Sequence, residues 1–200
     1  MKKLVLSTRN QHKIKEVETI LNNCLSANVT LLSLDDIGLV EEIEENGNSF
    51  EENALIKARA AFEKSGIPSI ADDSGLTVAA LGGAPGIYSA RYASTNGQDA
   101  DDEENNKLLI KNLENASDRS AAYVCVIAYV DENREFCARG ETSGIILENP
   151  QGSGGFGYDP YFYSTDAKAC FGTISAEEKN KYSHRRRALE EFAKKWEEKR

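Results

Sequence analysis

The chain opens on the segment KLVLSTRNQHK, residues 3–13, in which a short apolar run leads into a polar turn. Residues 3–7 predict a buried strand, and the apolar spacing of residues 13–22 predicts a helix after the turn. Helix and strand alternate along the first part of the chain, and strands cluster afterwards. This order favours an α/β fold on a mixed sheet.

The other predicted elements extend over the rest of the chain. Ser49 with Glu52 and Ser175 with Glu178 have the spacing of capping boxes, which open helices. Gly66 ends the helix that begins after Ser49. Further strands are expected at residues 30–33, 69–71 and 161–163, a hairpin at 121–130 and 135–146, and further helices at 101–113 and from 184 into 195.

Composition indicates an ordinary globular protein. The chain has 200 residues, of which 40% are hydrophobic and 28% charged, and no linker-like stretch divides it, so we expect residues 1–200 to form one domain. No apolar run approaches a membrane span, and the apolar stretch near the start is too short for a secretory signal. Four widely spaced cysteines contain no paired metal motif. We therefore expect a cytoplasmic protein without a membrane partner.

Charge is distributed unevenly. The formal net charge of −9 argues against a protein that coats nucleic acid, which is usually basic. Residues 179–200 nevertheless hold nine Lys or Arg against four Asp or Glu. Such a basic end is either a solvated helix face or one wall of a site for a polyanion.

Two polar segments follow predicted strands. Thr8, Asn10 and Lys13 lie at a strand–helix junction, where helix amides and a lysine favour phosphate, although a plain polar turn has the same composition. Asp72 and Asp73 follow residues 69–71, and strand alternation would direct only one of them towards a ligand. Magnesium is typically held by one or two carboxylates with phosphates, and the acidic residues 41–45 could supply the second. The alternative is a structural Asp-Ser-Gly turn.

Two later segments complete the candidate site. Residues 152–159 combine flexible glycines with Phe156, Tyr158 and Asp159, which suit stacking on a base and accepting from its N–H groups, unless Phe156 simply joins the core. His184 and Arg185 stand at a predicted helix start, where cations are disfavoured unless an anionic or carbonyl-bearing partner is present. Together the segments predict a nucleoside triphosphate site.

The chain closely resembles the inosine triphosphate pyrophosphatase family. The resemblance is carried by STRNQHK (residues 7–13), SFEENA with a following KA (49–58), IADDSGL (70–76), LGGAPGIYSARY (81–92), GGFGYDP (154–160) and EKNKYSHR (178–185). It implies Mg²⁺-dependent hydrolysis of non-standard purine nucleoside triphosphates to the monophosphate and pyrophosphate. It also implies an elongated two-lobed α/β protein on a long curved mixed sheet, with flanking helices, a central nucleotide-binding cleft and a homodimeric state.

The same resemblance assigns roles to individual residues. Asp73 would be the catalytic carboxylate and would hold the metal together with Glu44. The substrate-binding residues would be Thr8, Arg9, Asn10, Gln11, His12 and Lys13 for the triphosphate, Ser74, Phe156, Gly157, Tyr158 and Asp159 around the nucleoside, Lys179 towards the nucleotide, and His184 and Arg185 at the 6-keto edge of the purine.

The sequence departs from the family's pattern at several positions, and two other functions are alternatives to this interpretation. Arg9 and His12 replace smaller residues of the family's first loop, Gly172-Thr173 stands where Ala-Glu is common, and Arg186 and Arg187 lengthen the basic run. Related alternatives are hydrolysis of a modified pyrimidine or standard nucleotide, as in a similarly folded family, and a nucleotide-binding regulator without hydrolysis. The presence of the two predicted metal ligands argues against the regulator.

Overall fold

The computed structural model describes residues 2–26, 28–95, 97–98 and 100–198. The strands are β1 (Lys2–Leu6), β2 (Val29–Leu32), β3 (Ser69–Val78), β4 (Ser120–Val130), β5 (Glu135–Ile146), β6 (Phe162–Ser164) and β7 (Ala169–Cys170). The α-helices are α1 (Gln11–Cys24), α2 (Phe50–Ser65), α3 (Asp102–Asn112), α4 (Ala176–Tyr182) and α5 (His184–Glu198). Short 3-10 turns occupy Ala79–Leu81, Gly86–Arg91, Asp159–Tyr161 and Phe171–Thr173.

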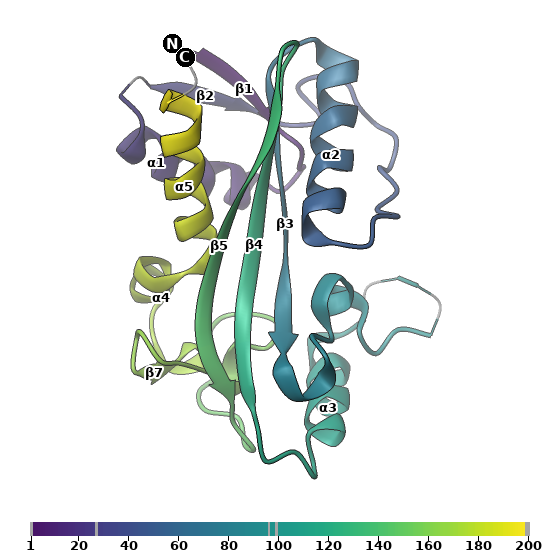
Figure 1. Ribbon diagram of the computed structural model, residues 1–200, viewed down its shortest axis with the longest axis vertical. Coiled ribbons are helices and arrows are strands. Elements are labelled where there is room, and N and C mark those ends of the chain that lie inside the picture. The colour runs from purple at the N-terminus through teal and green to yellow at the C-terminus, as the bar shows by residue number, and fades with distance from the viewer. Residues whose placement is uncertain (1, 27, 96, 99, 199–200) are drawn as a thin grey trace. The chain divides into compact units, whose positions relative to one another are not determined.

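A seven-stranded sheet of order β2-β1-β3-β4-β5-β6-β7 forms the framework (Figure 1). Strand β1 pairs in parallel with β2 and β3, whereas β6 pairs antiparallel with β5 and β7. The prediction of an α/β fold on a mixed sheet with flanking helices is therefore confirmed. The hairpin of β4 and β5 also agrees with its predicted range to within one residue.

The chain divides into two compact units, each built from separate segments. The first comprises residues 1–73, 125–140 and 186–200, and the second residues 74–124 and 141–185. In the first unit, Leu4 and Leu6 belong to the hydrophobic cluster of α1 and α5, and the intervening Val5 joins Ala61 of α2 in another cluster. The alternation of β1 thus puts helices on both faces of its sheet, as Figure 1 shows.

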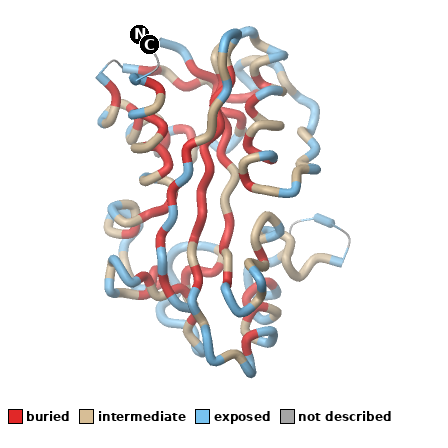
Figure 2. Tube along the Cα trace, in the orientation of Figure 1, coloured by how far each residue is buried: buried red, intermediate tan, exposed pale blue. Residues whose placement is uncertain are grey.

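The second unit has an aromatic core. Phe162 and Phe171 are fully buried, and the Phe162 ring lies 4.6 Å from the ring of Tyr123 and 5.2 Å from that of Phe171. Leu109 of α3 closes the same cluster. Figure 2 shows nearly continuous burial along β4, whose residues contribute to the cores of both units. These cores make the strands rigid supports for the loops at their ends.

Capping residues mark the beginnings and ends of the helices largely where the sequence predicts them. The Ser49 and Ser175 hydroxyls accept from the amides of Glu52 and Glu178, and Gly66 terminates α2 with a φ of 65°. Helix α1 begins two residues earlier than predicted because Asn10 is its N-cap. Among the described residues, no helix is both long and apolar enough to cross a membrane.

The strand predicted at residues 69–71 is longer than expected, and the alternative Asp-Ser-Gly turn does not form. Strand β3 continues through Asp72, Asp73, Ser74 and Gly75 to Val78. Adjacent aspartates would normally favour a solvated turn, because an unpaired carboxylate is costly to bury. Here each carboxylate has a lysine partner on its own side of the strand, which removes the need to leave the sheet.

Candidate functional site

The junction between β1 and α1 is a capped helix N-terminus. The Thr8 hydroxyl accepts from the amide of Asn10 at 3.2 Å, and the Asn10 side chain accepts from the amide of Lys13 at 3.1 Å. The remaining amides of this turn can receive an anion, which the helix dipole favours. The side chains of Gln11 and His12, two predicted phosphate ligands, lie outside the described part of the structure.

Arg9 is engaged by the segment that follows β2. Its guanidinium donates to the carbonyl of Leu39 at 2.8 Å and of Glu41 at 3.3 Å, and its Nε lies 3.3 Å from the Asp35 carboxylate. These contacts anchor the acidic segment that contains Glu44. The geometry therefore favours a supporting role for Arg9 over the predicted phosphate contact.

The paired aspartates of β3 lie on opposite sides of the strand. Asp72 is buried and forms an ion pair with Lys13 of α1 at 2.5 Å. Asp73 accepts from Lys57 of α2 at 3.0 Å, and the same ammonium donates to Glu45 at 2.9 Å. This alternation was predicted from the period of a strand. The first unit thus contains a cluster of Lys57, Asp73 and Glu45, which we call the Lys57 cluster.

Burial controls the charges of the Lys57 cluster. It raises the pKa of Asp73 to about 6, although the Lys57 ammonium opposes the shift. Burial by itself would lower the pKa of Lys57, but the surrounding carboxylates, chiefly Asp73, outweigh it and raise that pKa. The pKa of Asp73 therefore lies closer to neutral pH than that of an ordinary aspartate, and such shifts are common among residues at functional sites.

A metal could bind at Asp73 only with help from other ligands. The Oδ2 atom of Asp73 is buried and has no hydrogen-bond partner among the described residues, so it can accept a cation. The same part of the chain shows no group of three or more acidic, histidine or cysteine side chains able to hold a metal. Magnesium commonly uses one or two carboxylates and completes its shell with phosphates and water, so these residues fit it. Glu44, the predicted second ligand, is exposed, and its neighbour Glu45 is the one that contacts Lys57.

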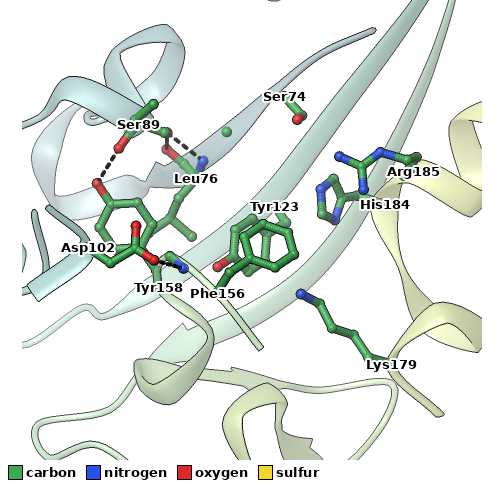
Figure 3. A pocket seen from close by; sticks show the side chains of 13 residues that line it. Ser74, Leu76, Ser89, Asp102, Tyr123, Phe156, Tyr158, Lys179, His184 and Arg185 are labelled. Atoms are coloured by element: carbon green, nitrogen blue, oxygen red, sulfur yellow. Dashed lines mark hydrogen bonds between the residues drawn. The ribbon is translucent and has the colours of Figure 1, made fainter. Parts of the chain in front are cut away.

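A pocket of about 170 Å³ lies within the second unit (Figure 3). Side chains from α4 and α5 enter it on one side, and Asp102, Ser89 and Tyr158 stand on the other. Predicted site residues that line it are Ser74, Phe156, Gly157, Tyr158, Lys179, His184 and Arg185, together with Gly75, Leu76, Ser89, Ala90, Asp102 and Tyr123, which were not predicted as ligands. Its aromatic side chains and few polar groups suit a flat heterocycle that also makes hydrogen bonds.

Phe156 is the exposed aromatic surface of this pocket. Its side chain stays out of the hydrophobic core, since the residue is 65% exposed, and the Lys179 ammonium lies 4.3 Å from its ring centroid. Lys179 also forms an ion pair with Asp159, which is fully buried. A cation held against one ring face leaves the other available for stacking.

Asp159 does not present a free carboxylate to the pocket. One oxygen accepts from the Tyr123 hydroxyl at 3.2 Å, and the other from the Phe156 amide at 2.9 Å and from Lys179. Burial, followed by the charge of Asp159, raises the pKa of Tyr123 well above its usual value, which keeps this hydroxyl a donor. The sequence analysis suggested that Asp159 accepts from the N–H groups of a bound base. Its contacts indicate instead that it supports Phe156.

His184 and Arg185 begin α5, as predicted, and line the pocket. The His184 ring is nearly parallel to that of Tyr123, with centroids 5.0 Å apart and an interplanar angle of 13°. This contact fixes the direction of the imidazole, while Arg185 is half-buried beside it. Two side chains that can donate hydrogen bonds therefore line the same pocket as the exposed ring of Phe156, which is a suitable arrangement for a base that carries a carbonyl oxygen.

Several residues of the site were missed by sequence reasoning. Lys57 lies in the quoted motif 49–58, but nothing local shows that it reaches Asp73, 16 residues away. Asp102 and Asn106 reach the loop at Gly157 from more than 50 residues away. The polar run of residues 101–106 in front of an apolar helix face is the only signal that could have drawn attention to them.

The model of the Ham1 family matches residues 4–195. A dITP/XTP pyrophosphatase of Geobacter sulfurreducens is 46% identical over 192 residues, which cover 94% of each chain. A protein of the same name from Clostridium perfringens is 43% identical over 201 residues, covering 96% of each chain.

Solved structures agree with the sequence comparison. A HAM1 protein from Coxiella burnetii superposes with a TM-score of 0.89 at 38% identity, covering 99% of this chain and all of that one. The Ham1 protein of Staphylococcus aureus gives a TM-score of 0.88 at 37% identity, and the whole of both chains is covered. The sheet and the flanking helices described above are thus shared by these proteins.

Proposed function

Because this chain belongs to the Ham1 family, we propose that it hydrolyses non-standard purine nucleoside triphosphates to the nucleoside monophosphate and pyrophosphate. The substrates would be inosine, deoxyinosine and xanthosine triphosphates, in keeping with the dITP/XTP pyrophosphatases that it resembles. The observation that carries the proposal is the pocket in which Phe156 offers a ring face beside the donors of His184 and Arg185.

Base selection follows from the chemistry of these donors. Hypoxanthine and xanthine carry an acceptor oxygen at C6, whereas adenine carries an amino donor there. Arg185 has only donors and keeps its charge, and His184 donates in its protonated form or the appropriate tautomer. A donor that faces a donor leaves both unsatisfied at about 1–3 kcal/mol for each buried group, so adenine should be rejected. Guanine shares the oxygen, and its exclusion requires other contacts at its 2-amino group.

Phosphate binding and catalysis are assigned to the first unit. The amides after Asn10 and the ammonium of Lys13 would bind the phosphates, and Asp72 holds Lys13 in place. Asp73 would orient a water molecule towards the α-phosphorus and hold Mg²⁺ with Glu44, while Lys57 fixes the Asp73 carboxylate. When bound, Mg²⁺ supplies positive charge that offsets the charge on departing pyrophosphate.

Three further properties belong to the proposal. We expect a homodimer, action in the cytoplasm, and no nucleic-acid partner, the last because the net charge of −9 opposes binding of polyanions outside the site. The substrate class supports the cytoplasmic assignment, because free nucleotides are its targets. Sedimentation at several protein concentrations would test the dimer.

A nucleotide panel tests the proposal. Inosine, deoxyinosine, xanthosine, adenosine, guanosine and cytidine triphosphates would be incubated with the protein and Mg²⁺, and pyrophosphate and orthophosphate would be quantified separately. We expect pyrophosphate from the first three and little turnover of the others. Equal turnover of all six, or preference for cytidine triphosphate, would refute the assigned base pocket. Tight binding of inosine triphosphate without turnover would instead support a nucleotide-binding regulator.

A further inference from the structure

Two side chains of helix α3 form hydrogen bonds with the loop that carries Phe156. The Gly157 amide donates to the Asp102 carboxylate at 2.6 Å, and the Gly157 carbonyl accepts from the Asn106 side chain at 2.9 Å. Both backbone polar groups of one loop residue are therefore bound by two side chains of one helix, one turn apart. Figure 3 shows Asp102 directed at this loop from the side opposite Lys179.

The loop depends on these hydrogen bonds for its shape. Phe156 is 65% exposed, so burial of its ring contributes little to fixing its position. The φ of Gly157 is 60°, a left-handed conformation that glycine reaches without strain but does not hold by itself. Directional contacts must therefore select this conformation. The Asp159 carboxylate binds the Phe156 amide from within the loop, and Asp102 and Asn106 bind Gly157 from outside it.

Asn106 provides an independent sign of this role. It is 7% exposed, its Oδ1 atom has no hydrogen-bond partner among the described residues, and its amino group donates to the carbonyls of Asp102 and Gly157. A buried amide with an unpaired oxygen is unfavourable for folding alone. Its amino group, however, joins the start of α3 to the loop, which an apolar side chain could not do.

We propose that Asp102 and Asn106 are positioning residues for base binding, which hold the Phe156 ring in its stacking position. The inference rests on the proposed function, since it takes Phe156 as the stacking partner of the base. Neither side chain acts on the reacting phosphate. Their loss should therefore weaken nucleotide binding and leave the chemical step intact.

Steady-state kinetics with inosine triphosphate test this role. Asp102→Ala and Asn106→Ala should each raise KM about fivefold, as expected for one lost hydrogen bond, with kcat within about twofold of wild type. Asp102→Asn keeps an acceptor oxygen for the Gly157 amide and should restore a near-normal KM. Glu104→Ala, in the same acidic turn, and Asn112→Ala, an amide near the end of α3, are matched controls and should leave KM unchanged.

A double-mutant cycle with Phe156→Ala makes the test specific. If the two residues act through Phe156, Asp102→Ala should change KM by less than about twofold once Phe156 is absent. An equal change in both backgrounds, or a fall in kcat with constant KM, would overturn the inference. Asp102 is exposed, so the Asp102→Ala variant should fold and can be tested even if Asn106→Ala does not fold. Failure of the proposed function would be distinct, because wild-type protein would then not hydrolyse inosine triphosphate at all.

Discussion

Replacement of Lys179 by methionine should destabilise the protein strongly. The Lys179 side chain is 10% exposed, and its partner Asp159 is fully buried. Methionine keeps most of the length of the side chain but removes the charge, so Asp159 would remain buried and lose its cation. The Tyr123 hydroxyl and the Phe156 amide would still donate to it, but neither carries a compensating charge.

The structure sets the size of the expected loss. Removing one partner of a buried ion pair costs about 3–5 kcal/mol, because the other charge stays desolvated. Lys181 offers a control two residues further along α4, where its ion pair with Glu178 has side-chain exposures of 55% and 41%. An exposed pair contributes only about 0–1 kcal/mol, so Lys181→Met should be nearly neutral.

Urea unfolding followed by circular dichroism would compare both variants with wild type. We expect the free energy of unfolding to fall by about 3–5 kcal/mol for Lys179→Met and by less than about 1 kcal/mol for Lys181→Met. The double variant Lys179→Met/Asp159→Asn should recover part of the loss, since the stranded charge is gone. Equal effects of the two single substitutions would refute the reasoning that burial makes the Asp159 pair important.

Four other predictions concern Asp73, Arg185 and the metal. Asp73→Asn should reduce kcat by about a hundredfold or more, measured with saturating inosine triphosphate. The raised pKa of about 6 means that folded Asp73 binds its proton more tightly than the unfolded chain does, so wild type loses stability as pH rises from 4 towards 6. In metal-free buffer, Asp73→Asn should therefore gain about 2–3 kcal/mol over wild type at pH 8 in urea unfolding and almost nothing at pH 4; equal gains at both pH values would contradict this. Arg185→Ala should lower kcat/KM for inosine triphosphate far more than for ATP, and a uniform fall would make Arg185 a phosphate ligand. Removal of divalent cations with a chelator should abolish pyrophosphate release and Mg²⁺ should restore it; full activity in the chelator would exclude the metal role of Asp73.

Local sequence patterns were sufficient to predict most of the strands and helices. The apolar run before the turn at Thr8, the capping serines and the hairpin all form as predicted, because period and caps are properties of neighbouring residues. The continuation of β3 through Asp72 and Asp73 could not be predicted in this way. It depends on Lys13 of α1 and Lys57 of α2, and the spacing of residues in the sequence does not reveal which lysine pairs with which aspartate.

The candidate site was predicted by residue but only partly by role. Phe156, His184 and Arg185 line one pocket, in agreement with the predicted nucleoside site. Asp159 and Lys179 were predicted to contact the nucleotide, and that role stays a prediction; what the sequence did not indicate is that they pair with each other across 20 residues of sequence. Burial decides that outcome, because a carboxylate enclosed by the fold must take the nearest cation.

Hydrolysis of inosine triphosphate in ¹⁸O-labelled water tests the central claim most directly. If Asp73 orients water towards the α-phosphorus, mass spectrometry of the products should find the label in inosine monophosphate and none in pyrophosphate. Label in pyrophosphate would show attack at the β-phosphorus. Labelled orthophosphate with inosine diphosphate would show attack at the γ-phosphorus, and either result would contradict the proposed reaction.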